Sequence, residues 1–205
     1  MASYQLAPLP QKLAIFDGFV EQGKSVTLVL KDRMRRQFDI KTLDGAQVLH
    51  VKGPLFTLHR RKTVHDTAGN HLFEITYKPS LIHSIFSIED PSGRQLMEVK
   101  NESASKSPTL RIIVASVSIR IRATFVNTST GQPVSLFMKR SPFDTSTEII
   151  DEATGAVVAR IDRKLINGRK QIVGRRTYHL TVAPGADLAL LAAMCICLDE
   201  RKHER

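Results

Sequence analysis

The chain of 205 residues contains no tryptophan, only two cysteines and few aromatic side chains, which make up 6% of its residues. So few cysteines exclude a disulfide framework, and a hydrophobic core, which a chain of this length can supply, must hold the fold together. Cys195 and Cys197 are two positions apart, where their side chains point in different directions. We therefore expect two reduced, buried thiols.

Long apolar runs are also scarce. The longest is Leu188 to Leu198, eleven residues without a polar side chain, which is shorter than the roughly 20 residues of a bilayer span. Met1 to Pro10 has neither a basic region nor a long apolar run, so we expect no signal peptide. A helix that is apolar on every face must be enclosed. Because Asp187 is a favourable N-cap, we predict a buried helix over residues 186–200.

Acidic residues are also fewer than basic ones. The chain has 20 Asp and Glu and 30 Lys and Arg, which gives a formal net charge of +10. This excess favours anionic partners such as phospholipid headgroups or nucleic acid, without choosing between them. The alternative is an ordinary solvated exterior with no partner. Base-stacking platforms are weakly supported, because there is no Trp and no aromatic residue interleaves with the arginine pairs.

Alternating apolar and polar residues, interrupted by polar turns, indicate that strands fill most of the chain. Each of five turns closes on a glycine, as expected of hairpin loops that need a positive φ angle: Gly45, Gly69, Gly93, Gly131 and Gly155. Five hairpins give ten strands. Three more runs, Val26 to Lys31, Leu110 to Val114 and Tyr178 to Val182, bring the total to twelve or thirteen.

Many short antiparallel strands and one wholly apolar helix are compatible with few architectures. Barrels of about eight strands are filled by their own side chains, whereas cans of about eleven can hold a central helix. We therefore predict a mainly β fold, a roughly twelve-stranded antiparallel β-barrel that encloses the C-terminal helix. One domain is expected over residues 11–200, with a tail at 1–10 and a charged tail at 201–205.

The end of the chain resembles a known family. The segment from Tyr178 to Leu190, with its Ala-Pro-Gly-x-Asp helix entry, and Leu198-Asp199-Glu200 are similar to the end of LURP-one-related proteins. Their first hairpin is similar to Leu28 to Lys31, Phe38-Asp39-Ile40 and Asp44-Gly45. The resemblance covers about residues 12–200. It implies the Tubby C-terminal-like fold, which tubby proteins and phospholipid scramblases share.

The same resemblance suggests where an anion could bind, because paired basic side chains on neighbouring strands of tubby proteins hold phosphoinositide headgroups. Two groups here are similar in type: Arg60, Arg61 and Lys62, and Arg120 with Arg122. In the second group, period-two alternation points Ile121 and Phe125 inward and both arginines outward. Neither group aligns with the tubby motif residue by residue.

Two motifs point to other chemistry and are rejected. Gly18 to Ser25 matches the P-loop pattern G-x-x-x-x-G-K-[ST], but the strand-like Val26 to Leu30 follows it where the phosphate-binding helix should begin. His59, His65 and His71 recur every six residues, yet no nearby Cys completes a metal site. We expect no catalytic residues, metal or cofactor, and a loop from Gly18 to Ser25.

Together these observations predict a non-enzymatic intracellular module, cytoplasmic and peripheral at membranes, that docks on acidic phospholipid through Arg60, Arg61, Lys62, Arg120 and Arg122. An acidic protein partner is a further candidate. The alternatives are a nucleic-acid-associated protein, which leaves the nucleus open as a location, a protein scaffold and, more remotely, a nucleotide-binding enzyme using Gly18 to Ser25.

Overall fold

The structure is a computed structural model, and it describes residues 5–33, 37–53, 61–78, 85–102, 119–140, 146–163 and 177–201. A short 3-10 turn precedes the strands. In chain order the elements are η1 (Asp17–Phe19), β1 (Val26–Arg33), β2 (Gln37–Thr42), β3 (Gln47–Lys52), β4 (Arg61–His65), β5 (His71–Lys78), β6 (Ile85–Glu89), β7 (Gln95–Glu102), β8 (Ile119–Val126), β9 (Pro133–Arg140), β10 (Ser146–Asp151), β11 (Val157–Arg163), β12 (Thr177–Val182) and α2 (Leu188–Arg201).

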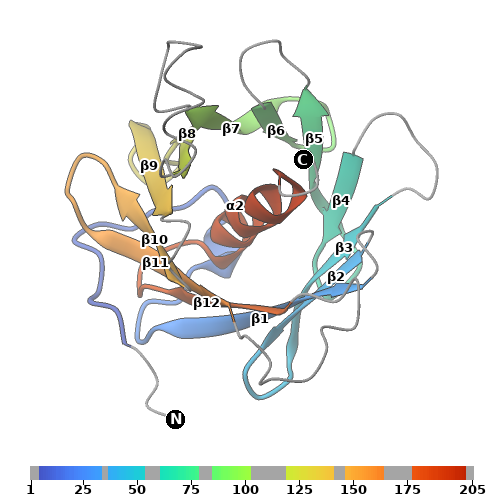
Figure 1. The fold of residues 1–205 in the computed structure, drawn as a ribbon, viewed down its shortest axis with the longest axis horizontal. Helices are drawn as coiled ribbons and strands as arrows, with labels where there is room; N and C mark the ends of the chain where they lie inside the picture. Colours follow the sequence, from blue (N-terminus) through green and yellow to red (C-terminus); the bar gives the residue numbers. More distant parts are fainter. Residues whose placement is uncertain are drawn as a thin grey trace, which may run out of the picture.

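The strands form a closed antiparallel barrel around α2, as Figure 1 shows. Each strand pairs with its neighbours in the sequence, and β1 closes the ring by pairing with β12 as well as β2. The predicted mainly β class, the strand number and the enclosed helix are confirmed. The run Leu110 to Val114, expected as a further strand, lies outside the described residues.

All five predicted glycine turns are confirmed, and their glycines have positive φ. At Gly93, for example, φ is 87°, a value that side chains with a Cβ rarely adopt. In the same turn, Asp90 Oδ1 accepts hydrogen bonds from the backbone N–H groups of Ser92 and Arg94. The hydrogen bond from the Ser92 side chain lowers the pKa of Asp90 below its ordinary value. Such local polar contacts explain why each hairpin turns at its Asp or Asn and Gly residues.

The barrel is filled by alternate strand residues and by every face of α2. Inward positions such as Phe38, Ile40, Phe73 and Ile75 are at most 2% exposed. From Ala189 to Leu198 the helix is buried on all sides, which is why its sequence needs no polar face. Cys195 and Cys197 are free and buried, as predicted, and burial raises the pKa of Cys197.

Asp187 joins the start of α2 to the N-terminal segment of the chain. Its Oδ1 accepts hydrogen bonds from the N–H groups of Ala189 (2.8 Å) and Leu190 (3.1 Å), which confirms the predicted N-cap. Its Oδ2 accepts two more, from Ile15 (3.0 Å) and Phe16 (2.7 Å). Burial raises the pKa of Asp187, and the four N–H donors act in the opposite direction. One carboxylate therefore caps the helix and holds a segment more than 170 positions away.

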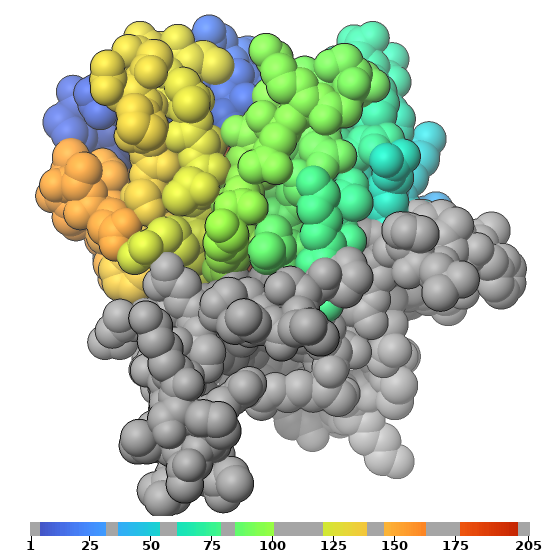
Figure 2. Space-filling model, turned by 90° about the horizontal axis from the view of Figure 1, so that it is seen from above, coloured from blue at the N-terminus to red at the C-terminus, as the bar shows by residue number. Residues whose placement is uncertain are grey.

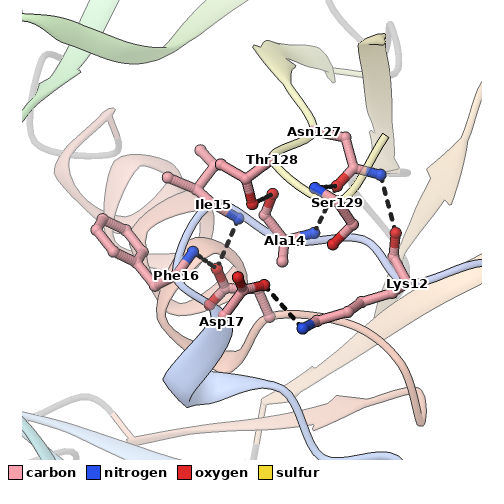
Figure 3. A network of polar contacts seen from close by, with 9 residues as sticks. Lys12, Ala14, Ile15, Phe16, Asp17, Asn127, Thr128 and Ser129 are labelled. Atoms are coloured by element: carbon pink, nitrogen blue, oxygen red, sulfur yellow. Dashed lines mark hydrogen bonds and ion pairs between the residues drawn. The ribbon is translucent and has the colours of Figure 1, made fainter. Parts of the chain in front are cut away.

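Asn127, between β8 and β9, holds the same segment from the other side (Figure 3). Its Nδ2 donates to the Lys12 carbonyl at 2.8 Å, and its Oδ1 accepts from the Ala14 N–H at 3.2 Å. Thr128 donates through its N–H and its hydroxyl to the Ala14 carbonyl. The N-terminal segment is thus bonded to the barrel where α2 begins.

Gly185, in the helix entry, has φ of 90°, and a Cβ there would lie 3.6 Å from the Leu9 side chain. Its N–H donates to the Glu21 carbonyl and its carbonyl accepts from the Leu13 N–H. Residues 13–17, all of them described, form no strand, and Leu13 makes an isolated bridge with Ala186. The backbone of this stretch is occupied by side-chain and turn contacts with Asn127 and Asp187 instead.

Candidate anion-binding surface

The barrel has two rims with different composition. The glycine-turn rim carries the five hairpin turns 43–46, 66–70, 90–94, 127–132 and 152–156 and the start of α2. The helix-end rim is the opposite end, where β1, β3, β5, β7, β9 and β11 finish and the even-numbered strands begin. The last turn of α2 reaches this rim, because Glu200 contacts Lys62 near the start of β4 and Asp199 contacts Tyr178 near the start of β12.

Basic residues occupy the strand ends of the helix-end rim. Five of the six strands that finish there end in Lys or Arg, and β4 begins with Arg61 there; the five residues are Arg33, Lys52, Lys78, Arg140 and Arg163. At the glycine-turn rim, none of the described strands begins or ends with Lys or Arg. The turns of that rim instead hold carboxylates, among them Asp44, Asp66, Asp90 and Glu152. The described barrel is therefore electrically asymmetric along its axis.

The charge balance of the chain agrees with this asymmetry. The described residues contain 18 Lys and Arg and 18 Asp and Glu, so they carry no formal net charge. The other twelve basic and two acidic residues account for the whole excess of +10. They all fall in stretches that join strands at the helix-end rim or follow α2. The basic excess is thus connected to the barrel at one end.

Along the sides of the barrel, cations and carboxylates are interspersed. Figure 2 shows one outer face, with the N-terminal segment in blue at its upper end. Across neighbouring strands Arg160 pairs with Glu148, their Nη1 and Oε1 atoms 3.9 Å apart. Within β7, Lys100 pairs with Glu98 at 2.7 Å. Such alternation of both signs is typical of a solvated exterior, so the strand sides offer less excess charge than the rim.

Among the first group of predicted residues, Arg61 is on the exterior. Its side chain is 55% exposed, and its Nε lies 3.0 Å from Glu74 Oε2 on β5. Arg60 lies outside the described residues. Arg61 therefore has a suitable position at the helix-end rim, although an anionic ligand would compete with Glu74 for its guanidinium.

Lys62 does not lie on the exterior, and this expectation is wrong. The residue is 6% exposed, its Nζ lies 3.0 Å from Glu200 Oε1, and it stands over the Phe38 ring at 5.3 Å from the centroid. It shares its side of β4 with the buried Val64, since residues two apart on a strand face the same way. Beside it, the Tyr178 hydroxyl donates a hydrogen bond to Asp199. This cluster fixes the end of α2 inside the barrel.

Replacing Lys62 with Met should destabilise the barrel by about 3 kcal/mol, because a largely buried carboxylate, Glu200, loses its cation. Adding Glu200→Gln should recover most of the loss. Lys78→Met is the matched control, since its half-exposed ion pair with Glu89 should contribute less than about 1 kcal/mol. Urea unfolding measures all three. Equal losses for Lys62→Met and Lys78→Met would contradict a structural role for Lys62.

The second group, Arg120 and Arg122, lies on β8. Ile121 and Phe125 are buried, as the alternation predicted. Arg122 Nη2 donates to Glu152 Oε1 at 2.7 Å, with both side chains near 40% exposed. Three strands, β5 to β7, separate β8 from β4. The structure therefore does not bring the two predicted groups together into one patch.

Of the remaining motifs, Gly18 to Ser25 is fully described and the three histidines are described in part. Within Gly18 to Ser25 the 3-10 turn η1 ends at Phe19 and the chain continues into strand β1, so the helix of a P-loop is missing, as predicted. His65 and His71 lie side by side, with ring centroids 5.3 Å apart, and His59 lies outside the described residues. In the described part of the chain no group of three or more His, Cys, Asp or Glu could hold a metal ion.

A closed twelve-stranded barrel around one apolar helix is the architecture implied by the Tubby C-terminal-like resemblance. A family model described as LURP-one-related matches residues 26–199, and the chain belongs to that family. An X-ray structure of a protein from Arabidopsis thaliana is similar, with a TM-score of 0.54 at 16% identity, over 92% of this chain and 98% of that one. At that identity the likeness shows the fold alone. No curated protein matches the sequence.

Among the described helices, none combines the length and apolar composition that crossing a bilayer requires.

Proposed function

We propose that this protein is a non-enzymatic binding module that docks end-on, by the helix-end rim, on membranes rich in acidic phospholipid. The observation that carries the proposal is the charge asymmetry of the barrel. Lys or Arg ends five of the six strands that finish at this rim, and the opposite rim has carboxylates in its turns. An end-on orientation brings these cations to the surface and keeps the carboxylates of the glycine turns away from it.

A flat anionic surface suits this arrangement better than a nucleic acid does. Strand ends of a barrel surround its axis, so cations such as Lys52, Arg61 and Lys78 can approach one plane together. Reading a DNA duplex instead requires an element that enters a groove, and α2 is enclosed by the barrel. Each Lys or Arg near an anionic membrane contributes about 1 kcal/mol. Several rim cations therefore provide useful affinity without a stereospecific pocket.

Not all of the basic residues predicted from the sequence belong to the docking rim. Arg61 belongs to the rim set, and Arg60 and Arg120 remain predicted contributors. Arg122 is farther from the rim, three residues into β8. It is ion-paired with Glu152, as Arg61 is with Glu74 and Lys78 with Glu89. Lys62 is left out because it is bonded to Glu200 inside the barrel.

The proposal is tested with a rim variant in which Lys52, Arg61 and Lys78 become Gln. Its partition onto vesicles that contain phosphatidylserine or a phosphoinositide should fall by roughly fivefold for each cation removed, from about 1 kcal/mol per cation. Co-sedimentation with vesicles measures the partition. Binding should also weaken as salt rises, because screening shortens the range of the attraction.

The control changes the same amount of charge at the other rim, with Lys24, Lys41 and Arg94 replaced by Gln. This variant should bind as the wild type does. Equal weakening by both triple variants would show that only net charge matters and would contradict docking by one rim. If neither variant changes partition, the rim cations play no part and the proposal fails.

A further inference from the structure

A row of histidines crosses the outside of the barrel at β3, β4 and β5. His50 pairs with His65 across the β3–β4 seam, and His65 pairs with His71 across the β4–β5 seam. Directly opposed residues of antiparallel strands share one face. The His65 and His71 rings are stacked at an interplanar angle of 29°. Three imidazoles thus stand next to one another on adjacent strands.

The surroundings of His65 favour a neutral ring. Its Nδ1 is buried and has no hydrogen-bond partner, so a charged ring would leave a buried N–H unsatisfied there. Burial is the largest cause that lowers the pKa of His65, followed by Lys52, His71 and His50, with Asp66 acting in the opposite direction.

Charged groups of both signs surround the row. On β2, Asp39 is opposite His50, and Lys31 of β1 is opposite Asp39. Glu74 of β5 already pairs with Arg61, and its Oε1 lies 3.8 Å from His71 Nε2. Asp66 is hydrogen-bonded to Asn70 within its turn. Adding protons to three adjacent rings therefore creates repulsion across both seams.

The β3–β4 seam is the least extensively paired in the described barrel. It has three registered residue pairs, whereas every other seam described has at least four and β8–β9 has eight. One of the three pairs is His50 with His65. A third of the registered pairing in this seam therefore depends on two titratable rings. The same strand, β4, carries Lys62, which holds Glu200 at the end of α2.

We propose that the histidine row is an acid-operated switch that keeps the β3–β4 seam closed while its rings are neutral and loosens the seam once they are protonated. A lowered pKa in the folded state means that the stability contributed by neutral His65 is present above about pH 6.5, the pKa of the unfolded chain. That stability is lost as pH falls through the lower folded pKa. Loosening of β4 would then extend to the Lys62 contact with α2.

Hydrogen–deuterium exchange at pH 7.5 and pH 5.0, corrected for intrinsic rates, tests the switch. Amides of residues 47–52 and 61–65 should exchange faster at pH 5.0, by about tenfold for each unit by which the folded pKa lies below the unfolded value. Amides of β8 and β9 should not change. The double variant His65→Gln with His71→Gln should lose the difference, and the single His65→Gln variant should reduce it.

Two further variants decide the interpretation. His179→Gln, on the exterior of β12, should keep the wild-type response, because two strands, β1 and β2, separate that histidine from the seam. His65→Lys carries a positive charge at both pH values and should show fast exchange in β4 at pH 7.5. Faster exchange at pH 5.0 that persists in the double variant, or that is uniform over all strands, would overturn the proposal.

Discussion

Replacing Leu191 with Asp should abolish cooperative folding. Leu191 is fully buried in the first turn of α2, so the substitution removes a core side chain and places an unpaired carboxylate inside the barrel. We expect a loss of at least about 5 kcal/mol, which is comparable with the whole stability of a typical domain. Thermal unfolding followed by circular dichroism should show no transition at the wild-type temperature.

The matched control is Leu43→Asp, which introduces the same charge in a turn where the leucine is 61% exposed. It should leave the unfolding temperature nearly unchanged. A Leu191→Asp protein that melts with the wild type would contradict the position of α2 inside the barrel.

The second large effect is expected at Asp187, where replacement by Ala should cost about 4 kcal/mol. About 1 kcal/mol of this comes from the lost helix cap, and the rest from the part-buried N–H groups of Ile15 and Phe16, which lose their acceptor. Asp187→Asn should also be destabilising. Each carboxylate oxygen of Asp187 accepts two hydrogen bonds, whereas an asparagine side chain has only one oxygen that can accept. Urea unfolding gives both values.

Asp17→Asn serves as the control for the second prediction. Asp17 is 66% exposed and contacts Lys12, so its replacement should cost less than about 1 kcal/mol. Exchange of the Ile15 and Phe16 amides should rise sharply in Asp187→Asn and stay unchanged in Asp17→Asn. If Asp187→Asn unfolds at the same urea concentration as the wild type, the four hydrogen bonds to Asp187 do not contribute to the stability of the fold.

Features determined by local chemistry could be predicted from the sequence. Hairpin turns closed by Gly45 or Gly93 follow from backbone preferences of a few residues. The enclosed helix follows from an apolar run without a polar face, and the N-cap from Asp187 at its start. In each case neighbouring residues contain enough information, because the preference is local.

The prediction for Lys62 is wrong because it assigns neighbouring basic residues to the exterior together, without regard to strand alternation. The sequence prediction treats Arg60, Arg61 and Lys62 as one exposed basic run. Lys62, however, is two residues before the apolar Val64 and therefore shares its inner side of β4. The partner that makes this burial tolerable, Glu200, is at the far end of the chain. Strand parity was a usable signal, whereas the ion pair was not visible in the sequence.

Contacts between distant segments account for the rest of what was missed. The N-terminal residues around Leu13 bond to Asn127 and Asp187, more than 100 positions away. Similarly, the end residues of β3 and β9, Lys52 and Arg140, share a rim only because the strands alternate in direction. Charge asymmetry between the rims therefore emerges from topology, and composition alone showed only the net charge.

The most direct test of membrane docking is co-sedimentation of the whole protein with vesicles of neutral lipid and with vesicles containing phosphoinositide, at two salt concentrations and with duplex DNA as competitor. We predict binding to the anionic vesicles alone, weaker at high salt and retained in the presence of DNA. Failure to bind any vesicle, or complete displacement by DNA, would contradict the membrane-docking function.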